Sequence, residues 1–450
     1  MTGQEFPDFT IQRLGEARVP SPLALGTVQN DLIADFVMDD QRVAFGIELG
    51  MDEVQVPLGA RGLLEKAGPR ERLFFDPVKV HAGIVTCGGL CPGLNNVIRS
   101  AVLTLWHRYG VRRISGIRYG YRGLLPEQQL PVEALTPEVV SEIHRFGGTA
   151  LGSSRGGGER IEAMVDTMER MNLSMLFTVG GDGTQRGAQR LAQEIARRKL
   201  PIAVVGIPKT IDNDLSFVER SFGFETAVSR AVEAVNAAHV EARDAIDGIC
   251  IVKVMGRESG FIAAHTALAT NDVNFVLVPE VPFDIDGPDG FLAHLEARIR
   301  ARHHAVIVLA EGAGQEHVES TGRDPSGNRK LGDFSTVLRE RIARYFASKE
   351  REVSLRFIDP SYIIRAAPAN PADAIYCAQL GASAVHAAMS GRTSCLVGLV
   401  NNRLVHVPIG LATHHRNRLS PESPLWRDVL ETTGQATMVN PGRAQPSTAM

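Results

Sequence analysis

Residues 173–197 read LSMLFTVGGDGTQRGAQRLAQEIAR, and this stretch decides the fold class. Residues 173–179 form a short apolar run, which is typical of a strand buried in a parallel sheet. The glycine-rich turn 180–183 ends the run, and apolar residues then recur at helical spacing to about Arg197. A strand, a turn and a helix in this order make one repeat of an α/β protein.

The same unit recurs along the chain from Lys79 onward. The further strands that we expect are residues 80–85, 202–207, 249–254, 273–278 and 305–309, and the expected helices include 94–109 and 225–240. Repeated alternation predicts an α/β fold. It has two doubly wound, Rossmann-like lobes with mostly parallel sheets, and the active site lies in the crevice between them.

The expected organisation has four parts, set by where this alternation begins and ends. They are an N-terminal extension that packs on the main body, a first lobe that includes part of the later chain crossing back, a second lobe, and a loosely attached tail rich in proline. Their boundaries are residues 1–78, 79–225, 226–414 and 415–450.

Composition excludes several classes of protein. The 450 residues are 44% hydrophobic and 22% charged, which is ordinary globular usage. A net charge of −3 argues against nucleic acid as the main partner. No apolar run approaches the ~18 residues of a membrane helix, and the first thirty residues do not read as a signal peptide. Five scattered cysteines fit reduced thiols, so we expect a cytoplasmic protein with no membrane partner.

The loop 88–96, GGLCPGLNN, lies between an expected strand and an expected helix. Glycines let backbone N–H groups approach a phosphate, and a helix N-terminus adds partial positive charge. The loop matches neither the Walker pattern nor the Rossmann fingerprint. A glycine turn without a ligand is therefore an equal alternative.

Two further loops carry carboxylates. Asp182 in GGDGT (180–184) can hold Mg²⁺, or it can be the capping aspartate of a tight turn. In PKTIDND (208–214), two carboxylates beside a lysine suit phosphoryl transfer, because one can accept a proton from a substrate hydroxyl. The alternative for this loop is a set of solvated Asx-turns.

Three loops place an arginine beside small or polar residues: LGSSRGG (151–157), MGRESG (255–260) and PSYIIR (360–365). A guanidinium in such a loop can bind phosphate bidentately, although a surface ion pair is the alternative for each one. The cysteines and the thirteen histidines form no transition-metal signature. We expect the histidine pairs 303–304 and 414–415 to be solvated.

Taken in order, these loops and the Pro279-Glu280 pair resemble the 6-phosphofructokinase family over roughly residues 79–410. The local sequences GGDGTQRGA and YIIRAAPAN are similar to those of the long ATP-dependent branch of the family, known from plants and kinetoplastids. The resemblance implies a glycolytic kinase that phosphorylates D-fructose 6-phosphate at the 1-hydroxyl with MgATP. It also implies an allosteric homotetramer in which the first lobe binds ATP and the second binds the sugar phosphate.

The resemblance implies a role for each matched residue. Asp212 corresponds to the general base, Asp182 to the Mg²⁺ ligand, and Arg257 to a catalytic arginine that stabilises transition-state charge. The ATP site corresponds to Gly89, Arg155, Gly156, Gly181, Asp182, Gly183 and Thr184. The sugar-phosphate site corresponds to Thr210, Ile211, Asp212, Met255, Gly256, Arg257, Glu280, Tyr362, Ile363, Ile364 and Arg365.

Gly183 and Lys209 correspond to the positions that decide the phosphoryl donor. In the family, aspartate at the first position marks pyrophosphate enzymes, as does lysine at the second. The ATP branch of plants and kinetoplastids shares the mixed pair of this chain, so the resemblance implies ATP. Gly248 stands where bacterial members have an arginine that reaches the neighbouring subunit. The resemblance implies allosteric control but does not identify the allosteric effector.

Three alternatives stay open. The chain is a pyrophosphate-dependent phosphofructokinase, an ATP-dependent kinase of another sugar phosphate such as sedoheptulose 7-phosphate, or an inactive regulatory subunit. The presence of Asp182, Asp212 and Arg257 argues against the last of these, because an inactive subunit has no physical need for carboxylates at a phosphate site.

Overall fold

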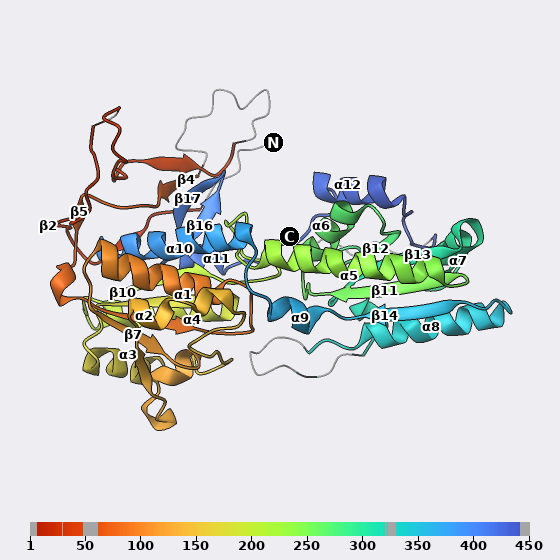
Figure 1. Cartoon of the computed structure of the whole chain (residues 1–450), viewed down its shortest axis with the longest axis horizontal. Coiled ribbons are helices and arrows are strands. Elements are labelled where there is room, and N and C mark those ends of the chain that lie inside the picture. The colour runs from red at the N-terminus through yellow and green to blue at the C-terminus, as the bar shows by residue number, and fades with distance from the viewer. Residues whose placement is uncertain (1–6, 29, 48–61, 320–321, 323–329, 442–450) are drawn as a thin grey trace. The chain divides into compact units, whose positions relative to one another are not determined.

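The computed structural model divides into two compact units (Figure 1). It describes residues 7–28, 30–47, 62–319, 322 and 330–441. Unit 1 consists of Met1–Glu225 and Arg365–Arg416, and unit 2 consists of Thr226–Ile364 and Asn417–Met450. The chain therefore passes between the units three times.

Unit 1 is built on a nine-stranded sheet in the order β3-β4-β17-β16-β10-β9-β6-β7-β8. The five strands from β16 to β7 are parallel, and the pairs toward both edges are antiparallel. The strands are β3 (Arg42–Ala44), β4 (Leu63–Lys66), β6 (His81–Thr86), β7 (Arg113–Ile117), β8 (Val132–Ala134), β9 (Met175–Gly180), β10 (Ala203–Pro208), β16 (Cys395–Val400) and β17 (Arg403–Pro408). Two short antiparallel pairs lie outside this sheet: β1 (Gln12–Arg13) with β15 (Arg392–Thr393), and β2 (Val19–Pro20) with β5 (Arg72–Leu73).

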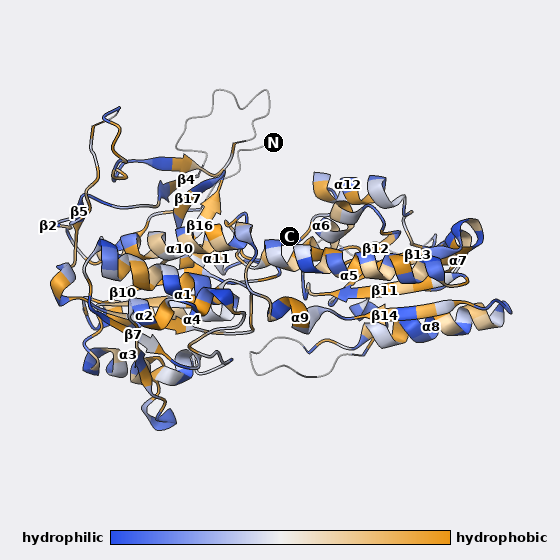
Figure 2. Ribbon diagram, viewed as in Figure 1, coloured by the Kyte–Doolittle hydropathy of each residue, from blue (hydrophilic) through white to orange (hydrophobic). Residues whose placement is uncertain are grey.

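Helices cover both faces of this sheet. Successive residues of a strand point to opposite faces, so Phe177 and Val179 enter one hydrophobic core and Leu176 enters the other. The first core contains apolar residues of α1 (Leu94–Leu103) and α10 (Pro371–Met389), and the second contains those of α3 (Ile161–Arg170), α4 (Asp182–Arg197) and α11 (Ile409–Ala412). Figure 2 shows the hydrophobic colour concentrated along strands such as β16. The sheet is doubly wound, as predicted.

The N-terminal extension belongs to unit 1. Its strands β3 and β4 continue the sheet beyond β17, and Glu65 on β4 is buried. The Glu65 carboxylate accepts hydrogen bonds from Arg392, from Arg70 at 3.1 Å and from His406 at 3.2 Å. Burial alone raises the pKa of Glu65, but the hydrogen bond from His406 and the charge of Arg392 lower it below its ordinary range. This ionic cluster ties the extension to β15 and β17.

Unit 2 is built on a four-stranded parallel sheet in the order β12-β13-β11-β14. The strands are β11 (Gly248–Val254), β12 (Phe275–Leu277), β13 (His304–Ala310) and β14 (Ser354–Ile358). The main helices are α5 (Phe224–Asp244), α6 (Phe261–Thr270), α7 (Phe291–Arg302), α8 (Phe334–Ser348), α9 (Ser361–Arg365) and α12 (Pro424–Thr433). Ile251, Phe275 and Ile307 form a core with apolar residues of α7 and α8.

The six strands expected from the sequence in residues 80–309 are β6 and β9 to β13, each within two residues of its expected ends. The helix expected over 94–109 is α1 followed by a π-helical turn, Thr104–Arg108. Among the described residues, no helix is both long and apolar enough to span a membrane.

The ends of the second lobe differ from the expectation. Residues 365–416 belong to unit 1, because β16 pairs in parallel with β10 in the middle of its sheet. Residues 417–441 are not a loosely attached tail. Pro424 begins α12 under a Ser423 cap, Trp426 is buried, and the Gln435 side chain accepts a hydrogen bond from Val276 N at 2.6 Å. Pro424 therefore marks the start of a helix in a packed segment.

Candidate active site

The loop after β9 carries Asp182, the predicted metal ligand, at the first position of α4. A Cβ on Gly180 would lie 2.2 Å from the Thr184 hydroxyl, so this turn requires glycine. The Asp182 side chain is only 14% exposed. Its Oδ2 pairs with Arg186 at 3.0 Å and with Arg416 at 3.7 Å, whereas its Oδ1 is buried without a hydrogen-bond partner in the described residues.

Burial raises the pKa of the Asp182 carboxyl, and the two arginines partly offset this effect. A buried carboxylate oxygen with no donor is unfavourable unless a cation occupies the site. Mg²⁺ prefers carboxylate oxygens that it can combine with substrate phosphates. The geometry therefore fits a magnesium ion at Oδ1.

Gly183 differs from its neighbours because a Cβ there would meet nothing within 4 Å. A side chain at this position has open space before it. In contrast, a Cβ on Gly181 would lie 3.1 Å from the carbonyl oxygen of Lys209. The open space beside Gly183 is room that a bound ligand could occupy.

The PKTIDND loop after β10 lies beside the Asp182 loop. Pro208 is in register with Gly180, and Lys209 N donates to Gly180 O at 3.0 Å. Thr210 Oγ1 donates to Asp214 Oδ1 at 2.5 Å, and Asn213 Oδ1 accepts from Ser221 N at 2.8 Å.

These hydrogen bonds fix the loop on both sides of Asp212. The negative charge of Asp214 contributes to the raised pKa of Asp182. Strands β9 and β10 are paired in parallel up to Gly180 and Pro208, so the loops that follow them begin side by side. Unit 1 therefore gathers the predicted base and the predicted metal ligand at one sheet edge.

The glycine loop after β6 and the Arg155 loop join the same edge. Gly88 N donates to Ser154 O at 3.0 Å, and Ser153 Oγ donates to Gly88 O at 2.6 Å. A Cβ on Gly89 would lie 3.8 Å from an Arg155 guanidinium nitrogen. Gly156 has a φ of +79°, a backbone conformation that favours glycine.

Lys209 lies beneath the glycine loop. Its side chain is buried, and Nζ donates to Gly89 O at 2.8 Å. Burial lowers the pKa of the Lys209 ammonium. In the same region, burial raises the pKa values of the Cys87 and Cys91 thiols to about 12, so both cysteines are unreactive packing residues.

In unit 2, the loop after β11 carries Met255, Gly256 and Arg257. Gly256 has a φ of +128°, and a Cβ there would lie 2.4 Å from Ser259 O, so the loop requires glycine. The equivalent loop after β13 lies beside it. Gly312 N donates to Gly256 O at 2.9 Å, and Glu311 N donates to Val254 O at 2.9 Å.

Glu311 is a residue that the sequence analysis missed. Its side chain is exposed at the carboxyl end of β13, next to the Met255–Arg257 loop. The predicted Glu280 follows the edge strand β12 and is partly buried. Its Oε1 accepts from Gly260 N at 2.9 Å and from Leu419 N at 2.8 Å, and burial raises its pKa. The Glu280 carboxylate thus holds backbone segments together.

The YIIR residues follow β14 in α9. Tyr362 and Ile363 are exposed, whereas the Ile364 side chain is fully buried, which leaves only its backbone for a ligand. Ile364 is the last residue of this segment in unit 2, and Arg365 belongs to unit 1.

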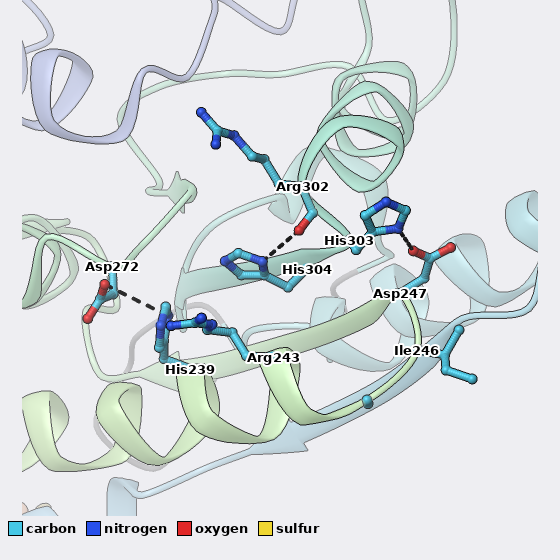
Figure 3. Close-up of a pocket in the computed structure, with 9 residues that line it drawn as sticks. His239, Arg243, Ile246, Asp247, Asp272, Arg302, His303 and His304 are labelled. Carbon is cyan, nitrogen blue, oxygen red and sulfur yellow. Dashed lines mark hydrogen bonds and ion pairs between the residues drawn. The ribbon is translucent and has the colours of Figure 1, made fainter.

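A different pocket of unit 2 lies at the amino ends of its strands, the side away from the loops described above (Figure 3). Its volume is about 610 Å³, and its charged and histidine residues are His239, Arg243, Asp247, Asp272, Arg302, His303 and His304. His303 is exposed, as predicted, and bonds Asp247 Oδ1 at 2.8 Å. His304 is only partly exposed and contacts the His239 ring edge-on at 5.6 Å. The predicted-solvated His414 and His415 are exposed.

Glycine turns and a buried carboxylate after the strands of a doubly wound sheet define a class of α/β proteins that bind phosphorylated ligands. The chain belongs to the phosphofructokinase family, whose model, described as Phosphofructokinase, matches residues 81–388.

Its relatives cover nearly the whole chain. It is 52% identical over 439 residues to the ATP-dependent 6-phosphofructokinase of Borreliella burgdorferi, with 95% of this chain and 97% of that protein covered. It is 48% identical over 442 residues to the ATP-dependent 6-phosphofructokinase of Amycolatopsis methanolica, with 95% of each covered.

The fold also matches solved structures. The pyrophosphate-dependent phosphofructokinase of Marinobacter aquaeolei superposes with a TM-score of 0.65 over 79% of this chain and 91% of that one. The two sequences are 21% identical, so this likeness supports the two-lobe fold alone.

Proposed function

We propose that this chain transfers the γ-phosphoryl group of MgATP to the 1-hydroxyl of D-fructose 6-phosphate, giving fructose 1,6-bisphosphate and ADP. The observation that carries the proposal is the buried Oδ1 of Asp182 beside the open space at Gly183. Two relatives, 52% and 48% identical to this chain, are named ATP-dependent 6-phosphofructokinase.

Asp212 is the proposed general base. Hydrogen bonds of Thr210, Asn213 and Asp214 fix the loop on both sides of it. It accepts the proton of the 1-hydroxyl as that oxygen attacks phosphorus. Positioning and charge stabilisation supply most of the catalysis in phosphoryl transfer.

Asp182 is the proposed Mg²⁺ ligand, and the ion supplies charge neutralisation at the transferred phosphoryl group. Gly89, Arg155, Gly156, Gly181, Gly183 and Thr184 are the proposed contacts of the nucleotide phosphates. Their support is that the three loops carrying them meet at one sheet edge of unit 1.

Arg257 is the proposed arginine for transition-state charge. The other proposed residues of the sugar-phosphate site are Thr210, Ile211, Met255, Gly256, Tyr362, Ile363, Ile364 and Arg365. We add Glu311 as the carboxylate that accepts sugar hydroxyls. The support is its exposed position beside the Met255–Arg257 loop, whereas the Glu280 carboxylate binds two backbone amides.

ATP is the proposed donor rather than pyrophosphate. Gly183 leaves space for a nucleotide, and the Lys209 ammonium bonds the backbone of the glycine loop. The matching experiment is a coupled assay with fructose 6-phosphate and ATP or pyrophosphate in parallel, with sedoheptulose 7-phosphate as a second acceptor. A higher kcat/KM with pyrophosphate, or with the seven-carbon sugar, would contradict the proposal.

The chain is proposed to act as a cytoplasmic homo-oligomer, a tetramer. The support for assembly is family membership, and the support for the compartment is that all five cysteines are free and buried. Light scattering checks the assembly, and an active monomer would contradict it.

A further inference from the structure

The segment 413–416 contacts the residues that follow each of the two carboxylate loops of unit 1. Arg186, on the helix that follows the Asp182 loop, donates to Thr413 O at 3.2 Å. Ser216, at the end of the PKTIDND loop, donates to His415 O at 2.8 Å, and Leu215 forms an isolated β-bridge with Arg416. Backbone contacts therefore hold Arg416 at the junction of the two loops.

The Arg416 guanidinium points to the carboxylate that is the proposed metal ligand. Its Nη2 lies 3.7 Å from Asp182 Oδ2, and its side chain is only 21% exposed. Arg186, the other cation at Asp182, is 55% exposed. Arg416 is thus the more buried of the two positive charges at this carboxylate.

The negative charges around Arg416 suggest a second role for its guanidinium, which is to bind an anionic ligand. Asp182, Asp212 and Asp214 bring three carboxylates to the sheet edge where a polyanionic donor has to bind. Lys209 already donates to Gly89 O, so its charge lies beneath the glycine loop. A largely buried guanidinium offers planar N–H pairs that match phosphate oxygens.

We propose that Arg416 is a donor-binding residue, which holds Asp182 in the unliganded protein and donates to a phosphate oxygen of the bound nucleotide. Arg416 lies outside every motif of the sequence, and the inference rests on the proposed use of a nucleotide donor.

The test is calorimetric titration of the full-length protein with MgADP, which binds without reacting. R416Q is expected to raise Kd about tenfold or more, and R416K to raise it less, because a charged hydrogen bond is lost or weakened. R403Q is the matched control, since the Arg403 side chain is exposed and donates to the carbonyl oxygen of its neighbour Asn402 at 3.0 Å. Fructose 6-phosphate affinity should stay unchanged in all three variants.

A second titration separates direct binding from an effect through Asp182. In a D182N background, with chelator and metal-free ADP, adding R416Q should again weaken binding. An unchanged Kd there would reduce Arg416 to a counter-ion of Asp182 and overturn the proposal.

The wild-type titration is interpreted first. A wild type that binds no MgADP overturns the proposed function, whereas binding that R416Q leaves unchanged overturns the role of Arg416. If R416Q does not fold, the same titration of R416K decides, and a Kd equal to that of the wild type overturns the proposal.

Discussion

Charge, rather than size, is expected to decide what a side chain at Gly183 does. Nothing lies within 4 Å of a Cβ there, so the first atom of a new side chain meets no clash outside its own helix. Its carboxylate would face the α-phosphate of ATP, and two like charges at ~4 Å repel by about 4 kcal/mol at an effective dielectric of 20. Because ~1.4 kcal/mol is tenfold, kcat/KM for ATP should fall by about three orders of magnitude.

G183N is the control, since it adds the same volume without the charge. It should lose much less activity with ATP, and G183D should lose less with pyrophosphate than with ATP. Steady-state kinetics on both donors measure these effects. Equal losses in G183D and G183N would show that bulk, and not charge, acts at this position.

Asp212 provides the second prediction at the scale of one residue. Replacing a general base costs on the order of 10²–10⁴ in rate, so D212N should lower kcat by that factor. The KM for ATP should change little, because the loop is fixed by Thr210, Asn213 and Asp214. A kcat near that of the wild type would remove Asp212 from the mechanism.

Two glutamates of unit 2, Glu280 and Glu311, each follow a strand but are expected to have different roles. E311Q should lower kcat/KM for fructose 6-phosphate about 10- to 100-fold, as expected when a charged hydrogen bond is lost. E280A should instead lower the melting temperature, because it removes the oxygen that accepts hydrogen bonds from Gly260 N and Leu419 N. Kinetics and thermal melts of both variants give the answer, and reversed effects would restore Glu280 to the sugar site.

The same strand ends show how far the sequence could predict the site. Strand β9 and its GGDGT loop were predictable because apolar run, glycine turn and helix are adjacent in the chain. Glu311 was not, because one glutamate before a glycine carries no local signal. Its position depends on the register of β13 against β11, which pairs Ala310 with Val254. Arg416 depends on a tertiary return of the chain.

For the whole molecule, the cluster around Glu65 makes stability depend on pH. Burial lowers the pKa of His406 well below its ordinary value, so it is neutral in the folded state. The unfolded chain takes up this proton below about pH 6.5. The folded state binds fewer protons, so the free energy of unfolding should fall as the pH drops from 7 toward 5.

The lowered pKa of Glu65 also makes the folded state less stable as the pH falls. This loss begins only when the pH reaches the ordinary pKa of a glutamate, below the range in which histidine titrates. The variant H406Q retains a donor for Glu65 and removes the titration. Denaturant unfolding between pH 5 and 7 should show a smaller slope for H406Q than for the wild type. Identical slopes would exclude His406 as the source.

The return of residues 365–416 to unit 1 also has a consequence for how the protein is made. Strand β16 lies between β10 and β17, yet it leaves the ribosome only after the first segment of unit 2, Thr226–Ile364, has been synthesised. Until then, β10 is an open edge of a hydrophobic parallel sheet, the kind of edge that associates with other chains. The nascent first unit thus has to wait, incomplete and prone to aggregation, while the second is translated.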